Sequence, residues 1–344
     1  MSAVATAPAL EIVDLEVVYE RRDRDPVRAV AGVSLTVQRG QILGLVGESG
    51  CGKSTLAKAA VGLEKPRAGR IVFDGRELSP LTRRARPLED TRLQMVFQNP
   101  FSSLNPRRKI GAQLQEALSM AWKGSRAGGE GSLRDRATAL LEQVGLPASA
   151  AERYAHQFSG GQRQRIAIAR ALAADPTVIV LDEPLSSLDA SAQAQIANLL
   201  VRLSRELDLA LVLISHDLAI VQHIADEVAV MYLGKLVETV GSGELWELPA
   251  HPYTEALIGA IPKPDGERNL PVALAGEVPD PSAPPSGCRF HPRCPYAMDR
   301  CRTEEPPALA IGSGRTVSCW LHDGAAEPRR PAELAAAGRG AAGA

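Results

Sequence analysis

The chain has 344 residues, of which 45% are hydrophobic, 23% are charged and 4% are aromatic. At roughly 150 residues per domain this length predicts about two domains, and the apolar content is enough for a core, which excludes a disordered or fibrous protein. The 39 Lys and Arg residues nearly balance the 40 Asp and Glu residues, giving a net charge of -1, and few aromatic side chains are available for base stacking. This composition argues against DNA or RNA as a partner.

Apolar runs in the chain are short. None approaches the about 20 residues that a membrane-spanning helix needs. The first ten residues, MSAVATAPAL, lack the basic cluster and long apolar stretch of a secretory signal. We therefore expect a cytosolic chain.

The N-terminal segments predict β-structure. Residues 11–18 (EIVDLEVV) and 33–37 (VSLTV) partly alternate apolar and polar side chains, as half-buried antiparallel strands do. Residues 41–46 (QILGLV) are nearly all apolar, which is typical of a buried strand. A glycine-rich loop and the helix-forming run LAKAAVGL follow them.

A short buried strand that ends in polar residues recurs further along the chain. PTVIVLDEP begins at Pro176 and LALVLISHD begins at Leu209, with a helical segment between them. One face of that helix is apolar at three- and four-residue spacing, and it carries Ile196, Leu199, Leu200, Leu203 and Leu207. Alternating strands and helices indicate an α/β fold with a parallel sheet that is covered on both faces.

The segment between Gln98 and Asp175 contains several helical patterns and no strong strand. It predicts a helical subdomain at about residues 99–175, with a flexible point at 123–132 (KGSRAGGEGS).

From Pro249 the composition shifts to Pro and Gly with little periodicity. We therefore expect a main domain of residues 1–248 and a loop-rich extension of residues 249–344. The part after about Asp323 is expected to be a disordered tail.

The sequence G-x4-G-K-S at Gly47–Ser54, after a buried strand and before a helix, predicts a phosphate-binding loop. Glycines let backbone N–H groups approach phosphate oxygens, and the following helix adds its positive end. Lys53 supplies a charge for the β- and γ-phosphates, and Ser54 offers a hydroxyl to Mg²⁺. The residues expected at ATP are Gly47, Glu48, Ser49, Gly50, Cys51, Gly52, Lys53, Ser54 and Thr55.

Two carboxylates, Asp182 and Glu183, end the strand VIVLDEP, where an open α/β sheet forms its ligand crevice. Asp182 suits a place beside Mg²⁺, and Glu183 suits a general base that polarises water in line with the γ-phosphate. Such a pair is often only a solvated turn, but the upstream phosphate loop favours the catalytic interpretation.

With these residues the chain resembles the nucleotide-binding subunits of ABC transporters over about residues 10–240. The motifs that carry the resemblance are SGGQ at Ser159–Gln162 (preceded by Phe158, where Leu is commoner), LDEP at Leu181–Pro184, the D-loop-like SSLD at Ser186–Asp189, the switch histidine His216, the Q-loop residue Gln98, and Tyr19 as the aromatic that stacks on adenine.

The resemblance implies a P-loop ABC ATPase core with a mainly parallel sheet, an antiparallel β subdomain, a helical subdomain and a C-terminal extension. It also implies that two subunits clamp each ATP. The signature residues Ser159, Gly160, Gly161 and Gln162 would face the γ-phosphate held by the other subunit, with the D-loop residues Ser187 and Asp189 nearby.

The same resemblance implies roles around the γ-phosphate. His216 would hold the water that Glu183 activates. Gln98 would reach Mg²⁺ or water, together with Ser54 and Asp182 as the Mg²⁺ site, and would report the nucleotide state to the helical subdomain.

Four of the five cysteines gather near the C-terminus with the spacing C-x5-C-x6-C-x17-C: Cys288, Cys294, Cys301 and Cys319. In a reducing compartment such a group suggests a metal site rather than disulfides. Compact zinc sites usually begin C-x2-4-C, so four thiolates here favour a 4Fe-4S cluster, with Zn²⁺ or free thiols as alternatives. The pattern resembles the extension on ATPase subunits of oligopeptide and dipeptide importers, some of which carry a 4Fe-4S cluster.

That extension, and QNPFSSLNPR at residues 98–107, resemble the subunit usually lettered F in peptide importers. The implied function is ATP hydrolysis that powers uptake of oligopeptides or dipeptides across the cytoplasmic membrane. The implied partners are a second, similar or identical ATPase subunit, two transmembrane permease subunits and an extracytoplasmic substrate-binding protein, with the chain peripheral on the cytoplasmic face.

Other functions stay open at this point. Importers of nickel, glutathione or sugars share the architecture. A non-transport ABC ATPase that acts on nucleic acid is a further alternative, but one phosphate loop, no heptad insert and no basic face argue against it. A kinase or GTPase would not explain SGGQ.

Overall fold

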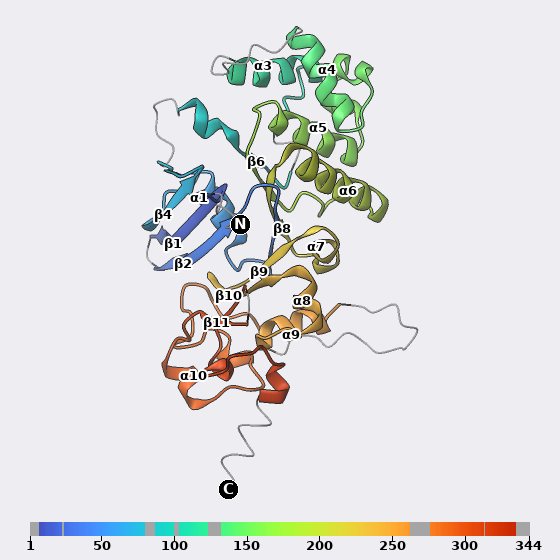
Figure 1. The fold of residues 1–344 in the computed structure, drawn as a ribbon. Helices are drawn as coiled ribbons and strands as arrows, with labels where there is room; N and C mark the ends of the chain where they lie inside the picture. Colours follow the sequence, from blue (N-terminus) through green and yellow to red (C-terminus); the bar gives the residue numbers. More distant parts are fainter. Residues whose placement is uncertain are drawn as a thin grey trace, which may run out of the picture.

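A computed structural model describes residues 7–22, 24–79, 87–99, 103–122, 132–261, 276–312 and 314–334. The described residues form a four-stranded sheet, in the order β2-β1-β4-β5, and an eight-stranded sheet, in the order β11-β12-β10-β9-β3-β8-β7-β6. In Figure 1 the helices α3 and α4 lie at one end of the molecule, and the C-terminal region lies at the other. These features confirm the predicted α/β ATPase fold.

The smaller sheet is antiparallel, as the alternating N-terminal segments predict. It contains β1 (Leu10–Arg21), β2 (Arg24–Val37), β4 (Ala68–Phe73) and β5 (Arg76–Glu77). Alternate residues of β1 such as Leu10 and Ile12 are buried, because one face of this sheet packs on the core and the other faces outwards.

The larger sheet has a parallel centre made of β6 (Leu93–Val96), β7 (Val178–Asp182), β8 (Ala210–Ser215), β3 (Ile42–Val46) and β9 (Glu227–Tyr232). Every residue of β3, β7 and β8 is buried, because helices cover both faces. Val46 pairs with Ser215, and Asp182 pairs with Ile214. The carboxyl ends of these strands therefore meet at one edge, where the polar residues that follow them come together.

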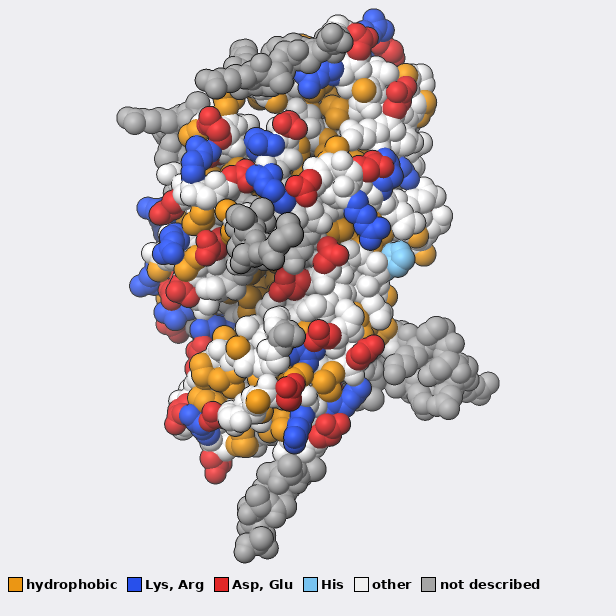
Figure 2. Space-filling model, viewed as in Figure 1, with side chains coloured by type: hydrophobic (Ala, Val, Ile, Leu, Met, Phe, Trp, Pro, Cys, Tyr) orange, Lys and Arg blue, Asp and Glu red, His pale blue; other side chains and the backbone are white. Residues whose placement is uncertain are grey.

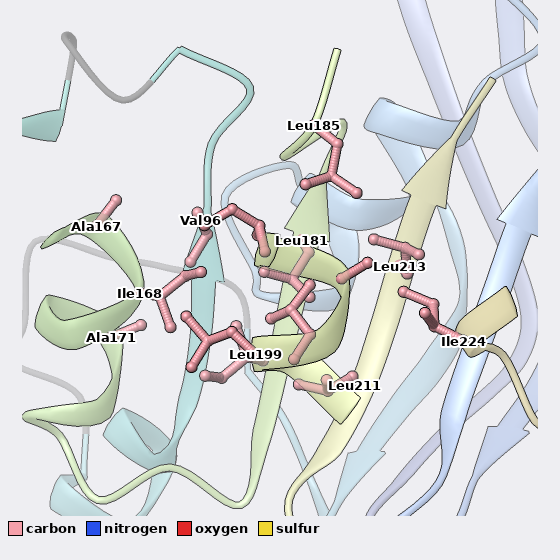
Figure 3. Packing of buried hydrophobic residues seen from close by; sticks show 14 of the residues in the cluster. Val96, Ala167, Ile168, Ala171, Leu181, Leu185, Leu199, Leu211, Leu213 and Ile224 are labelled. Atoms are coloured by element: carbon pink, nitrogen blue, oxygen red, sulfur yellow. The ribbon is translucent and has the colours of Figure 1, made fainter. Parts of the chain in front are cut away.

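One face of the sheet packs against α1 (Lys53–Ala60), and the other packs against α5 (Gly160–Leu172), α6 (Ala190–Leu207) and α7 (Leu218–Ile224). Figure 3 shows Ile168 of α5 and Leu199 of α6 pointing toward Leu181 of β7. The apolar face predicted for α6 is buried except at Leu207, which is 45% exposed. The helix ends there, because Asp208 takes a left-handed conformation with φ 51°.

The helical subdomain contains α3 (Ile110–Trp122), α4 (Leu133–Gln143), the short 3-10 helices η2 (Ala148–Glu152) and η3 (Ala155–Gln157), and α5. Within residues 103–122 and 132–175 it has no strand, as expected. Another 3-10 helix, η1 (Leu88–Arg92), precedes β6. Residues 123–131 of the segment predicted to be flexible lie outside the described residues, as do residues 100–102 of the importer-like stretch.

The C-terminal region continues the larger sheet. After β10 (Lys235–Gly241) come α8 (Ser242–Glu247) and α9 (Pro252–Gly259), and then η4 (His291–Arg293), α10 (Asp299–Thr303), β11 (Leu309–Ile311), β12 (Arg315–Val317) and η5 (Trp320–His322). β12 pairs antiparallel with β10, so the extension shares backbone hydrogen bonds with the larger sheet of the core.

The tail that was expected to be disordered after Asp323 is placed as far as residue 334. Gly312 donates a backbone hydrogen bond to Ala326, and Arg330 donates to the Glu247 carbonyl, so this part packs on the extension and corrects the prediction. Residues 335–344 lie outside the described part. In the described part of the chain, no helix combines the length and apolar character needed to span a membrane.

Candidate nucleotide-binding site

The loop between β3 and α1 requires glycine at two positions. Gly47 has φ 151°, and a Cβ there would lie 2.1 Å from the Met231 carbonyl oxygen. Gly52 has φ 109°, and its Cβ would lie 2.1 Å from the Ala29 carbonyl oxygen. Both conformations are rare for residues with side chains. The backbone therefore passes close to its neighbours and curls into the tight loop that the sequence predicts.

Lys53 begins α1 and is held inside the loop. Its side chain is buried, and its ammonium donates to the Gly47 carbonyl at 2.7 Å and to the Glu48 carbonyl at 2.9 Å. Gly52, the N-cap of α1, provides no side chain to cap the first N–H groups of the helix. These N–H groups and the ammonium together make a site suited to phosphate.

A hydroxyl and a carboxylate meet beside the loop. Ser54 Oγ donates to Asp182 Oδ1 at 2.8 Å, and Asp182 is only 5% exposed. Burial raises the pKa of Asp182 above its usual value, and the hydrogen bond from Ser54 opposes that shift. Oxygen ligands of this kind suit Mg²⁺. Gln98, the third residue predicted for Mg²⁺, contacts Glu183 instead.

Glu183 gathers the other predicted catalytic side chains. It follows β7 with φ 45°, and its N–H donates to the Ile214 carbonyl of β8 at 3.1 Å. Glu183 Oε2 accepts from Gln98 Nε2 at 3.0 Å and lies 3.4 Å from His216 Nδ1. The ends of three neighbouring strands thus bring together the residues predicted to handle water and the γ-phosphate, and their roles stay predictions.

Tyr19 lies close to the start of α1. Its hydroxyl donates to Thr55 Oγ1 at 3.4 Å, and burial raises the pKa of its phenol. The ring is therefore next to the loop, as an adenine-stacking residue would be, and the stacking itself stays a prediction.

The signature SGGQ opens α5 as a capping box. Gln162 N donates to Ser159 Oγ at 3.4 Å, and Ser159 N donates to Gln162 Oε1 at 3.1 Å. Ser159 and Gly160 are exposed, and within the described residues no hydrogen bond or ion pair links the signature to the phosphate loop of the same chain. An exposed helix start that is not used within its own chain fits the predicted action on a second subunit.

The D-loop, like the signature, is an exposed segment at the start of a helix. Asp189 caps α6 by accepting from Ala192 N at 2.9 Å, and Ser187 is exposed. Its predicted place at a subunit interface stays untested.

Two residues of the extension reach the phosphate loop, and the sequence analysis missed both. Glu48 N donates to Tyr253 Oη at 2.8 Å, and Arg293 donates to both carboxylate oxygens of Glu48 at 2.7 and 3.0 Å. The partners are 205 and 245 residues apart in the chain, so no local pattern could have paired them.

The four C-terminal cysteines line one small cavity, together with Phe290, Trp320 and Leu321. Burial raises the pKa of Cys288 to about 11 and that of Cys294 to about 12, and it also raises the pKa of Cys319. All are free thiols.

The four cysteines thus lie around one cavity, but the metal site predicted from their spacing is not supported. Among the described residues no group of three or more His, Cys, Asp or Glu side chains is placed to hold a metal ion. The predicted 4Fe-4S cluster and its zinc alternative therefore find no support in this arrangement.

Known proteins share both regions of the chain. The family model described as "ABC transporter" matches residues 30–186, and the model described as "Oligopeptide/dipeptide transporter, C-terminal region" matches residues 237–301. A probable peptide ABC transporter ATP-binding protein of Sinorhizobium fredii is 51% identical over 301 residues, which cover 87% of this chain and 84% of that protein.

A relative from Escherichia coli, the dipeptide transport ATP-binding protein DppF, is 43% identical over 335 residues, which cover 95% of this chain and 98% of that protein. A solved dimeric ATP-binding cassette in a post-hydrolysis state with ADP and Pi superposes with a TM-score of 0.58 at 26% identity, covering 68% of this chain and 98% of that one.

Proposed function

The chain belongs to the ATP-binding proteins of ABC transporters, and we propose that it powers the import of oligopeptides or dipeptides. It is an ATPase of that family. The observation that carries the proposal is the joint occurrence, in one folded unit, of an assembled nucleotide site and a C-terminal region that matches the oligopeptide/dipeptide transporter model.

ATP binds with its phosphates in the loop Gly47–Thr55. The ammonium of Lys53 and the first N–H groups of α1 neutralise the phosphate charge, and Tyr19 stacks on adenine. Ser54 and Asp182 would hold Mg²⁺, which would supply further positive charge beside the phosphates. The support for this assignment is the buried hydrogen bond between Ser54 and Asp182 and the buried, loop-bound ammonium of Lys53.

Hydrolysis needs a water molecule oriented in line with the γ-phosphate. Glu183 accepts a proton from that water, while His216 and Gln98 fix the positions of the water and the carboxylate. Their contacts with Glu183 Oε2 support these roles, because they bring the three side chains together at the carboxyl ends of neighbouring strands.

A second ATPase subunit completes the site. Its residues Ser159–Gln162, at the positive end of α5, stabilise the γ-phosphate from the opposite side. Closure of the dimer on ATP, and opening after hydrolysis, then provide the mechanical step. The exposed capping box and the dimeric ATP-binding cassette among the similar structures support this arrangement.

The permease subunits dock in a groove beside the helical subdomain. This cavity of about 580 Å³ is lined by α3, α5 and the end of β6, and it contains the exposed side chains of Phe97 and Met120. Phe97 directly precedes Gln98, which bonds to Glu183, so a permease segment in the groove would sense the state of the nucleotide site. Two permeases, and a substrate-binding protein outside the membrane, complete the importer.

The chain is therefore proposed to be peripheral on the cytoplasmic face of the membrane. Nickel, glutathione or sugars are alternative cargoes. Action on nucleic acid is less well supported, because Figure 2 shows Lys and Arg side chains interspersed with Asp and Glu on the visible face rather than gathered into a basic surface.

A 4Fe-4S cluster in the extension is retained only as a hypothesis for iron and sulfide analysis of anaerobically purified protein. The shared cavity of the four cysteines is its support, and no step of the mechanism depends on it.

The test is ATP hydrolysis by the complete transporter in proteoliposomes, with its two permeases, its ATPase partner and its binding protein. The expected result is a rate that di- or oligopeptides stimulate and that Lys53→Ala in this chain reduces. A rate of ATP hydrolysis that peptides leave unchanged, but that nickel, glutathione or a sugar stimulates, would identify that compound as the cargo instead. Hydrolysis unchanged by Lys53→Ala would refute the nucleotide site.

A further inference from the structure

The extension and the phosphate loop are joined by a bidentate ion pair. Arg293 Nη1 and Nη2 lie 2.7 and 3.0 Å from the two oxygens of Glu48, and the Arg293 side chain is 4% exposed. Glu48 is the second residue of the loop, and its side chain is 23% exposed. A paired, planar contact of this kind fixes both position and orientation.

The Arg293 guanidinium is itself held firmly. It lies 5.9 Å from the ring centroid of Tyr232, whose hydroxyl is 3.5 Å from Nη1. Tyr232 packs against Tyr253 and Phe290 with ring centroids 4.7 and 5.3 Å away. Arg293 also ends the short helix η4, between Cys288 and Cys294. The arginine thus projects from a packed aromatic cluster and not from a mobile surface.

Tyr253 adds a second contact on the same loop residue. Its hydroxyl accepts from Glu48 N at 2.8 Å, while the Glu48 carbonyl accepts from the Lys53 ammonium at 2.9 Å. The side chain, the N–H and the carbonyl of Glu48 therefore all have partners. The partners of the side chain and of the N–H come from the extension, and the carbonyl is held by Lys53, the lysine expected to bind phosphate, and by Cys51 N.

The charge of Glu48 explains why such a clamp is needed. A carboxylate in a loop that receives a triphosphate adds repulsion, and at short range in a partly buried site this repulsion is considerable. The guanidinium of Arg293 neutralises the carboxylate and fixes its position. Without that pairing, the Glu48 carboxylate would repel the triphosphate, and its side chain would no longer be held in place beside the loop.

We propose that Arg293 and Tyr253 are positioning residues of the ATP site, through which the C-terminal extension sets ATP affinity by holding Glu48. This inference rests on the proposed function, because it assumes that Gly47–Thr55 binds ATP. Neither residue takes part in the chemistry, so the effect falls on binding and leaves the turnover of bound ATP nearly unchanged.

The experiment measures ATP binding by fluorescence titration, and KM and kcat for hydrolysis, on the full chain in its complete transporter. Arg293→Met leaves the Glu48 carboxylate unpaired, and we expect Kd and KM for ATP to rise about tenfold, with kcat within about twofold of the parent. Adding Glu48→Gln to Arg293→Met removes the unpaired charge and should recover most of the lost affinity. Tyr253→Phe should raise Kd about threefold.

Arg300→Met is the matched control. Arg300 lies in the same extension and makes exposed ion pairs with Glu304 and Asp323, away from the loop, so its variant should bind ATP like the parent.

Two results would overturn the inference: an unchanged Kd in Arg293→Met, or no recovery when Glu48→Gln is added. Should Arg293→Met fail to fold, the double variant and Arg293→Lys, which keeps the charge, decide the matter. ATP affinity that recovers in the double variant Arg293→Met with Glu48→Gln supports the proposed role of Arg293. An equal loss of ATP affinity in Arg293→Met, Arg293→Lys and the double variant refutes it. If the parent itself fails to bind ATP, the proposed function fails, which is a distinguishable outcome.

Discussion

Substituting Gly47 by Ala tests the derived shape of the phosphate loop. The new Cβ would lie 2.1 Å from the Met231 carbonyl oxygen, so the loop must move by about 1.3 Å to reach an ordinary contact near 3.4 Å. A shift of about 1 Å in a positioning element costs about 100-fold in function. The strained φ of 151° adds a stability cost of about 1–3 kcal/mol. We therefore expect ATP affinity to fall by about 100-fold.

Two other glycines separate the clash from the conformational cost. Gly50, in the same loop, has φ 79°, and no atom lies within 4 Å of the position a Cβ would take there. Gly75, in the turn between β4 and β5, has φ 77° and also has no atom within 4 Å of that position. Ala at either should cost only about 1–2 kcal/mol of unfolding free energy. The assays are ATP titration by fluorescence and chemical denaturation. ATP binding by Gly47→Ala that equals binding by Gly50→Ala would refute the reasoning.

Two further predictions concern catalysis and the core. Glu183→Gln should slow hydrolysis about 10²- to 10⁴-fold and still allow ATP-dependent dimer closure, as measured by phosphate release and by sedimentation; undiminished hydrolysis would remove Glu183 as the base. Leu199→Ala should lower the free energy of unfolding by about 2–5 kcal/mol in urea denaturation, because Leu199 is 4% exposed in the core. Leu207→Ala, 45% exposed on the same helix, should change it by less than about 0.5 kcal/mol, and equal losses would contradict the described packing.

The sequence predicts those parts of the site that local chemistry determines. The glycines at 47 and 52, the lysine that follows and the carboxylates Asp182 and Glu183 each occur where a strand ends, and parallel pairing then brings the strand ends together. Gln98 and His216 follow neighbouring strands and meet Glu183 for the same reason.

Long-range contacts escape such reasoning. The core and the C-terminal extension are joined by the strand pairing of Glu238 with Val317 and by the ion pair of Glu48 with Arg293. The composition of the extension had indicated only loops. No periodicity predicts these contacts, because the first is a backbone pairing between strands far apart in the chain and the second depends on how the packed aromatic cluster positions the Arg293 side chain. The cysteines illustrate a similar limit: spacing brings four thiols to one cavity, whereas metal ligation depends on sulfur placement that spacing does not determine.

The most direct test of ATP binding between two ATPase subunits is the structure of the transporter with Glu183→Gln and ATP bound. We expect the γ-phosphate to lie between Lys53 of this chain and the signature helix of the second ATPase subunit, and the facing site to contain Ser159–Gln162 of this chain. A nucleotide contacted by one ATPase subunit alone in the closed, ATP-bound complex would contradict it.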